Sequence, residues 1–118
     1  MNELGKKGEE LAISHLRGQG FTILKTNWRY GHKEIDIIAQ KGKTIHFVEV
    51  KARSSRFIDE PKQAVILRKQ RNIIGAAEWY MRLNENDCEG CFDIVSIIFY
   101  SNDRYVLEHI ENAFEPTF

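Results

Sequence analysis

The sequence predicts a single α/β domain, residues 1–118, in which a central mixed sheet of about five strands is flanked by two main helices. The order of the predicted elements is one reason. Three β-rich runs, a long helical stretch and two further β-rich runs follow one another, which requires a crossover connection. The composition, 42% hydrophobic and 29% charged, is typical of an ordinary soluble domain. No membrane-spanning run or signal-peptide pattern occurs, so a cytoplasmic location is expected.

The first predicted helix runs from Glu3 to Gln19 and ends at glycines. Its apolar side carries Leu4, Leu11, Ala12 and Leu16. Glu9 falls at the edge of this side, whereas Glu10 projects toward solvent. Glu9 is therefore the better candidate for a functional glutamate, with a merely solvent-facing role as its alternative.

Three β-rich runs follow the first helix. The first, from Phe21 to Arg29, ends near Trp28, whose ring we expect to pack in the core or on the hairpin rather than to stack on bases. After a turn, the runs from Glu34 to Gln40 and from Thr44 to Lys51 flank the polar stretch 41–43. This pattern indicates a hairpin of antiparallel strands.

The register of this hairpin brings two carboxylates side by side. With Gly42 and Lys43 as the two central turn residues, counting outward along both strands sets Asp36 opposite Glu49. Carboxylates that face each other on a sheet repel, at a cost of roughly 0.2–1 kcal/mol. We therefore expect a cation between them.

A divalent metal ion with oxygen ligands is the natural candidate for this cation. Because side chains alternate between the faces of a strand, Lys51 shares the face of Glu49. A lysine in this position can orient or deprotonate the water that attacks a substrate. The hairpin therefore predicts a hydrolytic metal site.

These residues resemble a known nuclease core. Asp36, 12 intervening residues and then Glu49-Val50-Lys51 are similar to the D…E-x-K core of the restriction-endonuclease-like nucleases, the PD-(D/E)xK superfamily. Archaeal Holliday-junction resolvases share this fold. The resemblance implies a restriction-endonuclease-like fold, a metal-dependent nuclease site and a nucleic-acid substrate.

Further motifs occur in order over nearly the whole chain: Gly8-Glu9-Glu10-Leu11-Ala12, Asn27-Trp28-Arg29, Glu34-Ile35-Asp36, Phe47-Val48-Glu49-Val50-Lys51-Ala52-Arg53, Phe92-Asp93 and Asn112-Ala113-Phe114. Together they resemble the bacterial YraN family. The Gly-Glu-x-x-Ala pattern of this family favours a role for Glu9 in the site. One position departs from the family, because Lys33 stands where a glycine often precedes Glu-Ile-Asp, and both carboxylates remain in place.

The net charge of zero conceals two oppositely charged parts. Residues 1–77 carry 15 lysines and arginines against 8 acids, whereas residues 78–118 carry 2 against 9. Positive charge follows directly on the third strand, at Lys51, Arg53, Arg56, Lys62, Arg68, Lys69 and Arg71. A solvated helix face explains single charges as well. As nucleic-acid contacts we expect Arg53, Arg56, Lys69, Gln70 and Arg71.

The second predicted helix runs from Pro61 to about Leu83. Its inward side carries Ile66, Gln70, Ile73, Ile74, Ala77, Tyr80 and Met81. Gln70 is the one amide among these residues, and a buried amide needs partners. We expect it to contact either a strand backbone or a water or phosphate of the site.

Two strands close the predicted sheet, an interior strand from Phe92 to Tyr100 and a last strand from Tyr105 to Ile110. The tail that follows carries two aromatic residues, Phe114 and Phe118. These rings must pack on the core or on a second subunit, which leaves a homodimer open.

The remaining candidate metal ligands are assigned no function. Cys88 and Cys91 supply two zinc ligands where a structural site needs four, so we expect a loop with two unliganded cysteines. Asp93 is expected to form a structural ion pair with Arg29 or Arg53. The histidines are scattered along the sequence at His15, His32, His46 and His109.

Two functions fit these observations. The first is a metal-dependent nuclease acting on DNA or RNA, in which Asp36, Glu49 and the Val50 carbonyl hold Mg²⁺ or Mn²⁺. Glu9 would assist, and Lys51 would position the attacking water. The second is a nucleic-acid-binding or protein-interaction module of nuclease-like fold without turnover. The intact acids and lysine count against the second function, and the neutral overall charge counts for it.

Overall fold

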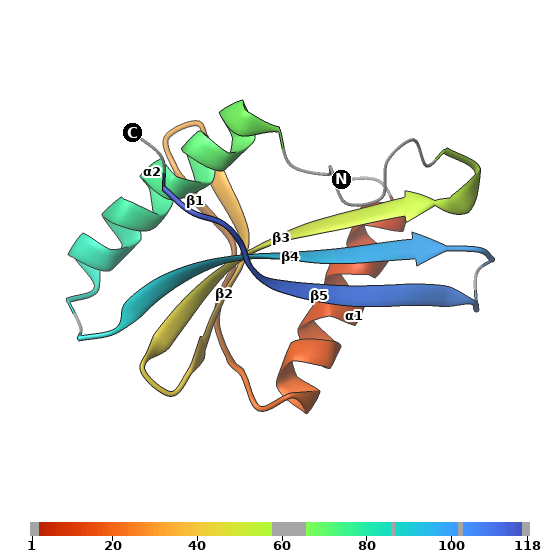
Figure 1. Ribbon diagram of the computed structural model, residues 1–118, viewed down its shortest axis with the longest axis horizontal. Coiled ribbons are helices and arrows are strands. Elements are labelled where there is room, and N and C mark those ends of the chain that lie inside the picture. Colours follow the sequence, from red (N-terminus) through yellow and green to blue (C-terminus); the bar gives the residue numbers. More distant parts are fainter. Residues whose placement is uncertain (1–2, 58–65, 86, 102, 117–118) are drawn as a thin grey trace.

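The computed structural model describes residues 3–57, 66–85, 87–101 and 103–116. Figure 1 shows the helices and strands that these residues form, coloured along the chain. In chain order the elements are α1 (Glu3–Gly18), β1 (Thr22–Tyr30), β2 (Lys33–Lys41), β3 (Thr44–Ser54), the 3-10 helix η1 (Ser55–Phe57), α2 (Leu67–Leu83), β4 (Glu89–Phe99) and β5 (Tyr105–Phe114). The predicted α/β class, a five-stranded mixed sheet with two main helices, is confirmed.

The five strands form one sheet in the order β1-β2-β3-β4-β5. Neighbouring strands are antiparallel except for β3 and β4, which run parallel. Parallel neighbours need a connection that returns the chain to its starting edge, and α2 lies on that connection. The predicted crossover is therefore present.

The two helices cover opposite faces of the twisted sheet (Figure 1). One core cluster packs beneath α2 and includes Phe47 and Tyr80. The other packs beneath α1 and includes Leu16 and Val48. Adjacent residues of β3 thus belong to different clusters, as a strand buried on both faces requires. Of the described helices, neither is long and apolar enough to cross a membrane.

Gly8 lets α1 approach β3 closely. A Cβ atom at position 8 would lie 2.5 Å from the Cβ atom of Ala52 in β3. A larger residue would therefore force the helix or the strand to shift, because protein interiors are already closely packed. This contact also fixes the position of Glu9, the next residue of α1.

The β2–β3 hairpin has the predicted register. The pairing follows it as far as Ile37 opposite Val48, and there the ladder ends. The next pair outward would be Asp36 and Glu49. Beyond this point the amide of Val50 donates a hydrogen bond to Asp36 Oδ2, at 2.8 Å. A side chain of β2, rather than its main chain, thus satisfies this donor, and the two strands part.

Strand β2 changes its alternation at the same place. Ile35 and Ile38 both belong to the cluster beneath α2, although strict alternation would put them on opposite faces. In β1, the residue opposite Asp36 is Asn27, whose backbone is left-handed with a φ of 49°. The distortion brings Ile35 and Asp36 to the same side of the sheet, so an apolar side chain lies directly beside the carboxylate.

The second helix is shorter than predicted. It begins at Leu67 rather than at Pro61, because Ile66 before it has an extended backbone with a ψ of 159°. Ile66 is 64% exposed, so its assignment to the inward side is wrong, whereas the predicted Ile73 is buried. Pro61 and Lys62 lie outside the described residues.

The last two strands are longer than predicted. β4 begins at Glu89, because it pairs with β3 from that residue on. The predicted loop is therefore wrong for Cys91, which is a strand residue, whereas Cys88 precedes the strand. β5 extends to Phe114, which is buried and stacks on Phe92 with 5.3 Å between ring centroids. Phe114 therefore packs on the core and is not evidence for a second subunit. Phe118 lies outside the described residues.

Gly8→Ala tests the close contact between α1 and β3. Alanine favours the helix by about 1 kcal/mol, but the overpacked contact costs about 1–3 kcal/mol, so we expect a net loss of stability. Gly18→Ala is the matched control, since a Cβ atom there meets nothing within 4 Å. Urea unfolding of both variants measures the difference. A Gly8→Ala protein at least as stable as the Gly18→Ala control would contradict the contact.

Candidate functional site

A cleft of about 370 Å³ opens where β2 and β3 part, next to the first turns of α2. Both predicted acids, Asp36 from β2 and Glu49 from β3, line it. The other lining residues are His32, Lys33, Glu34, Ile66, Arg68, Lys69, Asn72 and Ile73. The two carboxylates thus meet on the α2 side of the sheet, as the hairpin register predicts.

Glu49 lies deep in this cleft, with 4% of its side chain exposed. Burial, together with the hydrogen bond and the negative charge of Asp36, raises the pKa of Glu49 to about 8, against an opposing effect of Lys69. The carboxyl group of Glu49 therefore keeps its proton to a higher pH than an exposed glutamate does. A proton held between two carboxylates marks a position where a cation would also be stabilised.

Lys69 is the lysine in contact with this acidic pair. Its Nζ atom lies 2.6 Å from Glu49 Oε2. Partial burial lowers the pKa of Lys69, but the surrounding carboxylates, Glu49 first, raise it overall. The sequence assigned Lys69 to the nucleic-acid backbone and missed this contact. A signal was present, because Lys69 precedes the buried Ile73 by four residues and so shares its side of α2.

Lys51 lies further along β3. Phe47, two positions before Glu49, belongs to the cluster beneath α2, so Lys51, two positions after it, points to the same side. Its side chain is half-buried, and among the described residues that line the cleft Lys51 does not appear. Lys51 therefore lies on the α2 side of the sheet, on which the cleft also opens, and its action on water stays a prediction.

Glu9 is turned inward on α1, on the other side of the sheet. It is 7% exposed, whereas Glu10 is exposed, so the expected orientation of these two glutamates is confirmed. Glu9 Oε1 accepts a 2.7 Å hydrogen bond from Asn27 Nδ2. Burial raises the pKa of Glu9, the Asn27 hydrogen bond opposes this, and the negative charge of the cleft acids raises it further. The charges of Asp36 and Glu34 therefore reach Glu9, although it lies on α1.

The predicted nucleic-acid contacts are spread over the surface. Lys69 lines the acidic cleft together with Arg68. Arg56 instead lines a second hollow of about 310 Å³, shared with Lys7 of α1. The remaining predicted contacts are not among the described residues that line these two hollows: Arg53, Gln70 and Arg71. The cleft mouth is therefore the place where basic side chains lie next to the acids.

Asp93 is the centre of a second polar cluster, on the α1 side of the sheet. The predicted ion pair of Asp93 with Arg29 or Arg53 is wrong. Arg29 instead forms an ion pair with an acidic residue of β2, at 3.1 Å. Two histidines that are far apart in the sequence, His46 and His109, both contact the Asp93 carboxylate. They meet because β4, which carries Asp93, pairs with β3 on one side and with β5 on the other.

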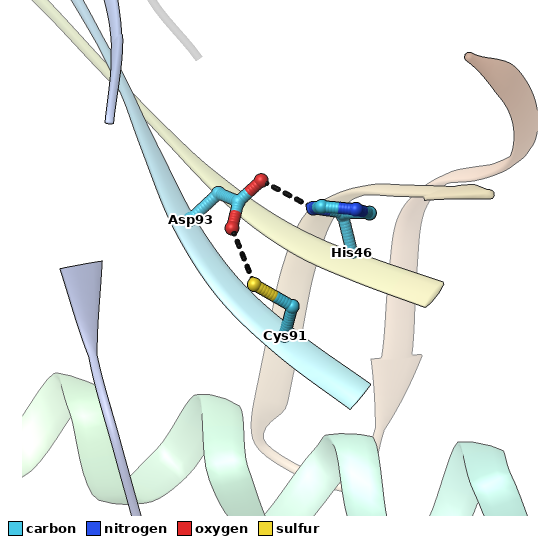
Figure 2. Close-up of side chains that lie close together, drawn as sticks. All are labelled: His46, Cys91 and Asp93. Carbon is cyan, nitrogen blue, oxygen red and sulfur yellow. Dashed lines mark hydrogen bonds and ion pairs between the residues drawn. The ribbon is translucent and has the colours of Figure 1, made fainter. Parts of the chain in front are cut away.

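The Asp93 carboxylate is fully buried and bonded on both oxygens. Oδ2 lies 2.6 Å from His46 Nδ1 (Figure 2) and 2.8 Å from His109 Nε2. Oδ1 accepts hydrogen bonds from the Cys91 thiol at 3.1 Å and from the Asn112 amide at 3.0 Å. Burial by itself raises the pKa of Asp93, but these hydrogen bonds lower it well below its usual value. Asp93 is therefore ionised at neutral pH.

Comparison with known proteins identifies the family. Residues 8–97 match the uncharacterised protein family UPF0102. The UPF0102 protein of Geobacter metallireducens is 46% identical over 113 residues, which cover 95% of this chain and 92% of the relative. The UPF0102 protein of Bacteroides thetaiotaomicron is 42% identical over 115 residues, which cover 98% of this chain and 94% of the relative. That of Chlorobium chlorochromatii is 41% identical over 117 residues, which cover 95% of this chain and 91% of the relative. The chain therefore belongs to UPF0102, the YraN family that its sequence motifs resemble.

Proposed function

We propose that this chain is a metal-dependent nuclease that hydrolyses phosphodiester bonds in DNA or RNA. The observation that carries the proposal is the acidic pair. Glu49 lies buried beside Asp36 in an open cleft, with a pKa raised to about 8. Two carboxylates in such a place are costly unless a cation neutralises them.

The residues of the cleft fit a divalent ion such as Mg²⁺ or Mn²⁺. Both acids offer anionic oxygen atoms, the ligands that these ions prefer. The Val50 amide holds Asp36 by one oxygen, which fixes the orientation of the carboxylate. We propose Asp36, Glu49 and the carbonyl oxygen of Val50 as ligands, with Glu9 adding negative charge from the α1 side.

Lys69 contacts the oxygen atom of Glu49 to which a metal ion would bind. Its side chain is 55% exposed, so its end can leave Glu49 without unfolding the first turn of α2. Once released, Lys69 and the neighbouring Arg68 would lie at the cleft mouth and could bind a phosphate of the substrate backbone.

The chemistry follows from these positions. A bound divalent ion would supply a nucleophile at neutral pH and neutralise charge on the scissile phosphate. Lys51, on the α2 side of β3, would orient the attacking water or take up its proton. In the proposed reaction no serine, cysteine or histidine acts as the nucleophile. Branched or flapped DNA is the first substrate to test, because the sequence resembles resolvases of DNA recombination.

A binding module without turnover, for nucleic acid or a protein partner, is the second candidate. The contact between Lys69 and Glu49 favours it, since a lysine already bound to Glu49 Oε2 competes with a metal ion for the same oxygen. The two candidates differ in whether the protein cleaves the nucleic acid that it binds.

Variants of the two proposed roles should separate metal binding from catalysis. Lys51→Ala is expected to lower cleavage by about 10²–10⁴-fold, the usual contribution of a general base, and to leave metal binding largely in place. Asp36→Ala removes an anionic ligand and should abolish both. Calorimetry with Mg²⁺ and Mn²⁺, paired with cleavage assays on junction, flap, single-stranded and duplex substrates, measures the two effects.

Lys43→Ala is the matched control, because Lys43 lies exposed at the hairpin turn. It should bind metal and cleave as the unmodified protein does. Normal cleavage by Lys51→Ala would show that the role given to Lys51 is wrong. Metal and nucleic-acid binding without cleavage of any substrate would favour the binding module.

The raised pKa of Glu49 also predicts how the metal-free protein responds to pH. This pKa rises from 4.5 to about 8 on folding, so between these values the folded state binds more protons than the unfolded state. The free energy of unfolding should therefore fall as the pH rises from about 5 to about 8 and level off above. Glu49→Gln should flatten this fall, whereas Glu10→Gln, at an exposed position, should retain it.

Urea unfolding at a series of pH values in the presence of a chelator measures this dependence. An equally steep fall in Glu49→Gln would assign the titration to another group and contradict the description of the acidic pair.

A further inference from the structure

The cluster around Asp93 is separate from the acidic cleft. In the parallel register of β3 and β4, His46 lies directly opposite Cys91, and Asp93 is the next residue of β4 on the same face. The facing position in β3 is Val48, which packs beneath α1, whereas the acidic cleft opens on the α2 side. The proposed nuclease reaction uses none of these three polar residues.

We propose that His46, Cys91 and Asp93 form a second metal site, which binds a transition-metal ion of the Zn²⁺ class. Their ligand atoms are an imidazole nitrogen, a thiol sulfur and a carboxylate oxygen, all within 4.8 Å of one another. Nitrogen and sulfur ligands select Zn²⁺ or Co²⁺ over Mg²⁺ and Mn²⁺, which prefer oxygen. The site therefore differs from the acidic cleft in the ion that it takes.

The geometry of the cluster suits such an ion after a small movement. The three side chains converge in Figure 2, where the Asp93 carboxylate bonds to both neighbours at 2.6 Å and 3.1 Å. Tetrahedral bonds of about 2.0–2.3 Å place ligand atoms roughly 3.3–3.8 Å apart. The two hydrogen-bonded pairs must therefore separate by about 1 Å or less, while the His46 nitrogen and the Cys91 sulfur already lie within 4.8 Å of each other.

Binding would exchange two hydrogen bonds for bonds to the metal. The Cys91 thiol would lose its proton to water, since the thiolate is the ligand. His46 would bind through Nδ1 and carry its ring proton on Nε2. Asp93 is already ionised and would give up only the hydrogen bonds that it accepts from these two groups. Metal binding should therefore release protons and become tighter as the pH rises.

Surrounding residues support the site. His109 Nε2 remains bonded to Asp93 Oδ2 and would orient the carboxylate. The ring of Phe21 packs edge-on against both imidazoles, with 4.9 Å to the centroid of His46 and 5.7 Å to that of His109. Cys91 is half-buried, so the cluster comes nearest to solvent at this residue, because His46 and Asp93 are buried. Three protein ligands leave one tetrahedral position for water.

A Co²⁺ titration of the full chain under reducing conditions tests the proposal. A thiolate ligand gives a sulfur-to-cobalt charge-transfer absorption in the near ultraviolet, and tetrahedral coordination gives strong visible bands. The acidic cleft cannot produce the sulfur band, because its lining residues contain no cysteine. We expect both signals to appear at one equivalent of Co²⁺ and to disappear when Zn²⁺ is added.

Cysteine variants identify the sulfur. Cys91→Ser should abolish the charge-transfer band, whereas Cys88→Ser is the matched control and should retain it. Cys88 lies three residues away, with its sulfur 3.3 Å from Gln40 Nε2. His109→Gln should weaken Co²⁺ binding by about 10–100-fold, the usual effect of removing an orienting partner, and should keep the band. Circular dichroism verifies that each variant is folded.

Three results would overturn the proposal. The unmodified protein could show no sulfur band at saturating Co²⁺. The band could persist in Cys91→Ser or vanish in folded Cys88→Ser. Co²⁺ could also bind with visible bands alone, which would place it on oxygen and nitrogen ligands such as Asp93, His109 and Glu111, whose ligand atoms also lie within 4.8 Å of one another.

Discussion

The parting of β2 and β3 after Ile37 and Val48 is the constraint on which the rest of the candidate site depends. A buried amide cannot be left without an acceptor, and the side chain of Asp36 provides one for Val50. The strands can therefore separate without an unsatisfied donor. The opening holds Glu49 at depth and leaves room for Lys69 to reach it from α2. A fully paired hairpin would leave no cleft between sheet and helix.

The sheet carries two buried acids that are accommodated in different ways. Glu49 has a carboxylate and one lysine as neighbours, so its burial favours the protonated form. Asp93 has two histidines, a thiol and a main-chain amide, and these donors favour the ionised form. Burial acts in the same direction on both groups, and the number of donors decides the outcome. An arriving cation would displace a proton from Glu49 and hydrogen bonds from Asp93.

The features that could be predicted from the sequence are those that a local sequence pattern determines. The turn at Gly42 set the hairpin register, and with it the neighbourhood of the two acids, because the pairing of a tight hairpin follows from its turn. The Asp93 cluster was missed, since its histidines meet only through pairing across the crossover, which no local pattern specifies. The contact of Lys69 with Glu49 was missed for a related reason, because the start and rotation of α2 depend on how it packs.

Within a few residues, strand β3 contributes side chains to the polar clusters on both faces of the sheet. His46 points toward α1 and Glu49 toward α2, and an odd number of positions separates them. Inserting or deleting one residue between them would turn one of the two side chains to the wrong face while leaving the other in place. Evolution can exchange amino acids in this segment, but it cannot lengthen or shorten the segment by one residue without losing one cluster. Relatives that retain both clusters should therefore keep an odd spacing between these two positions.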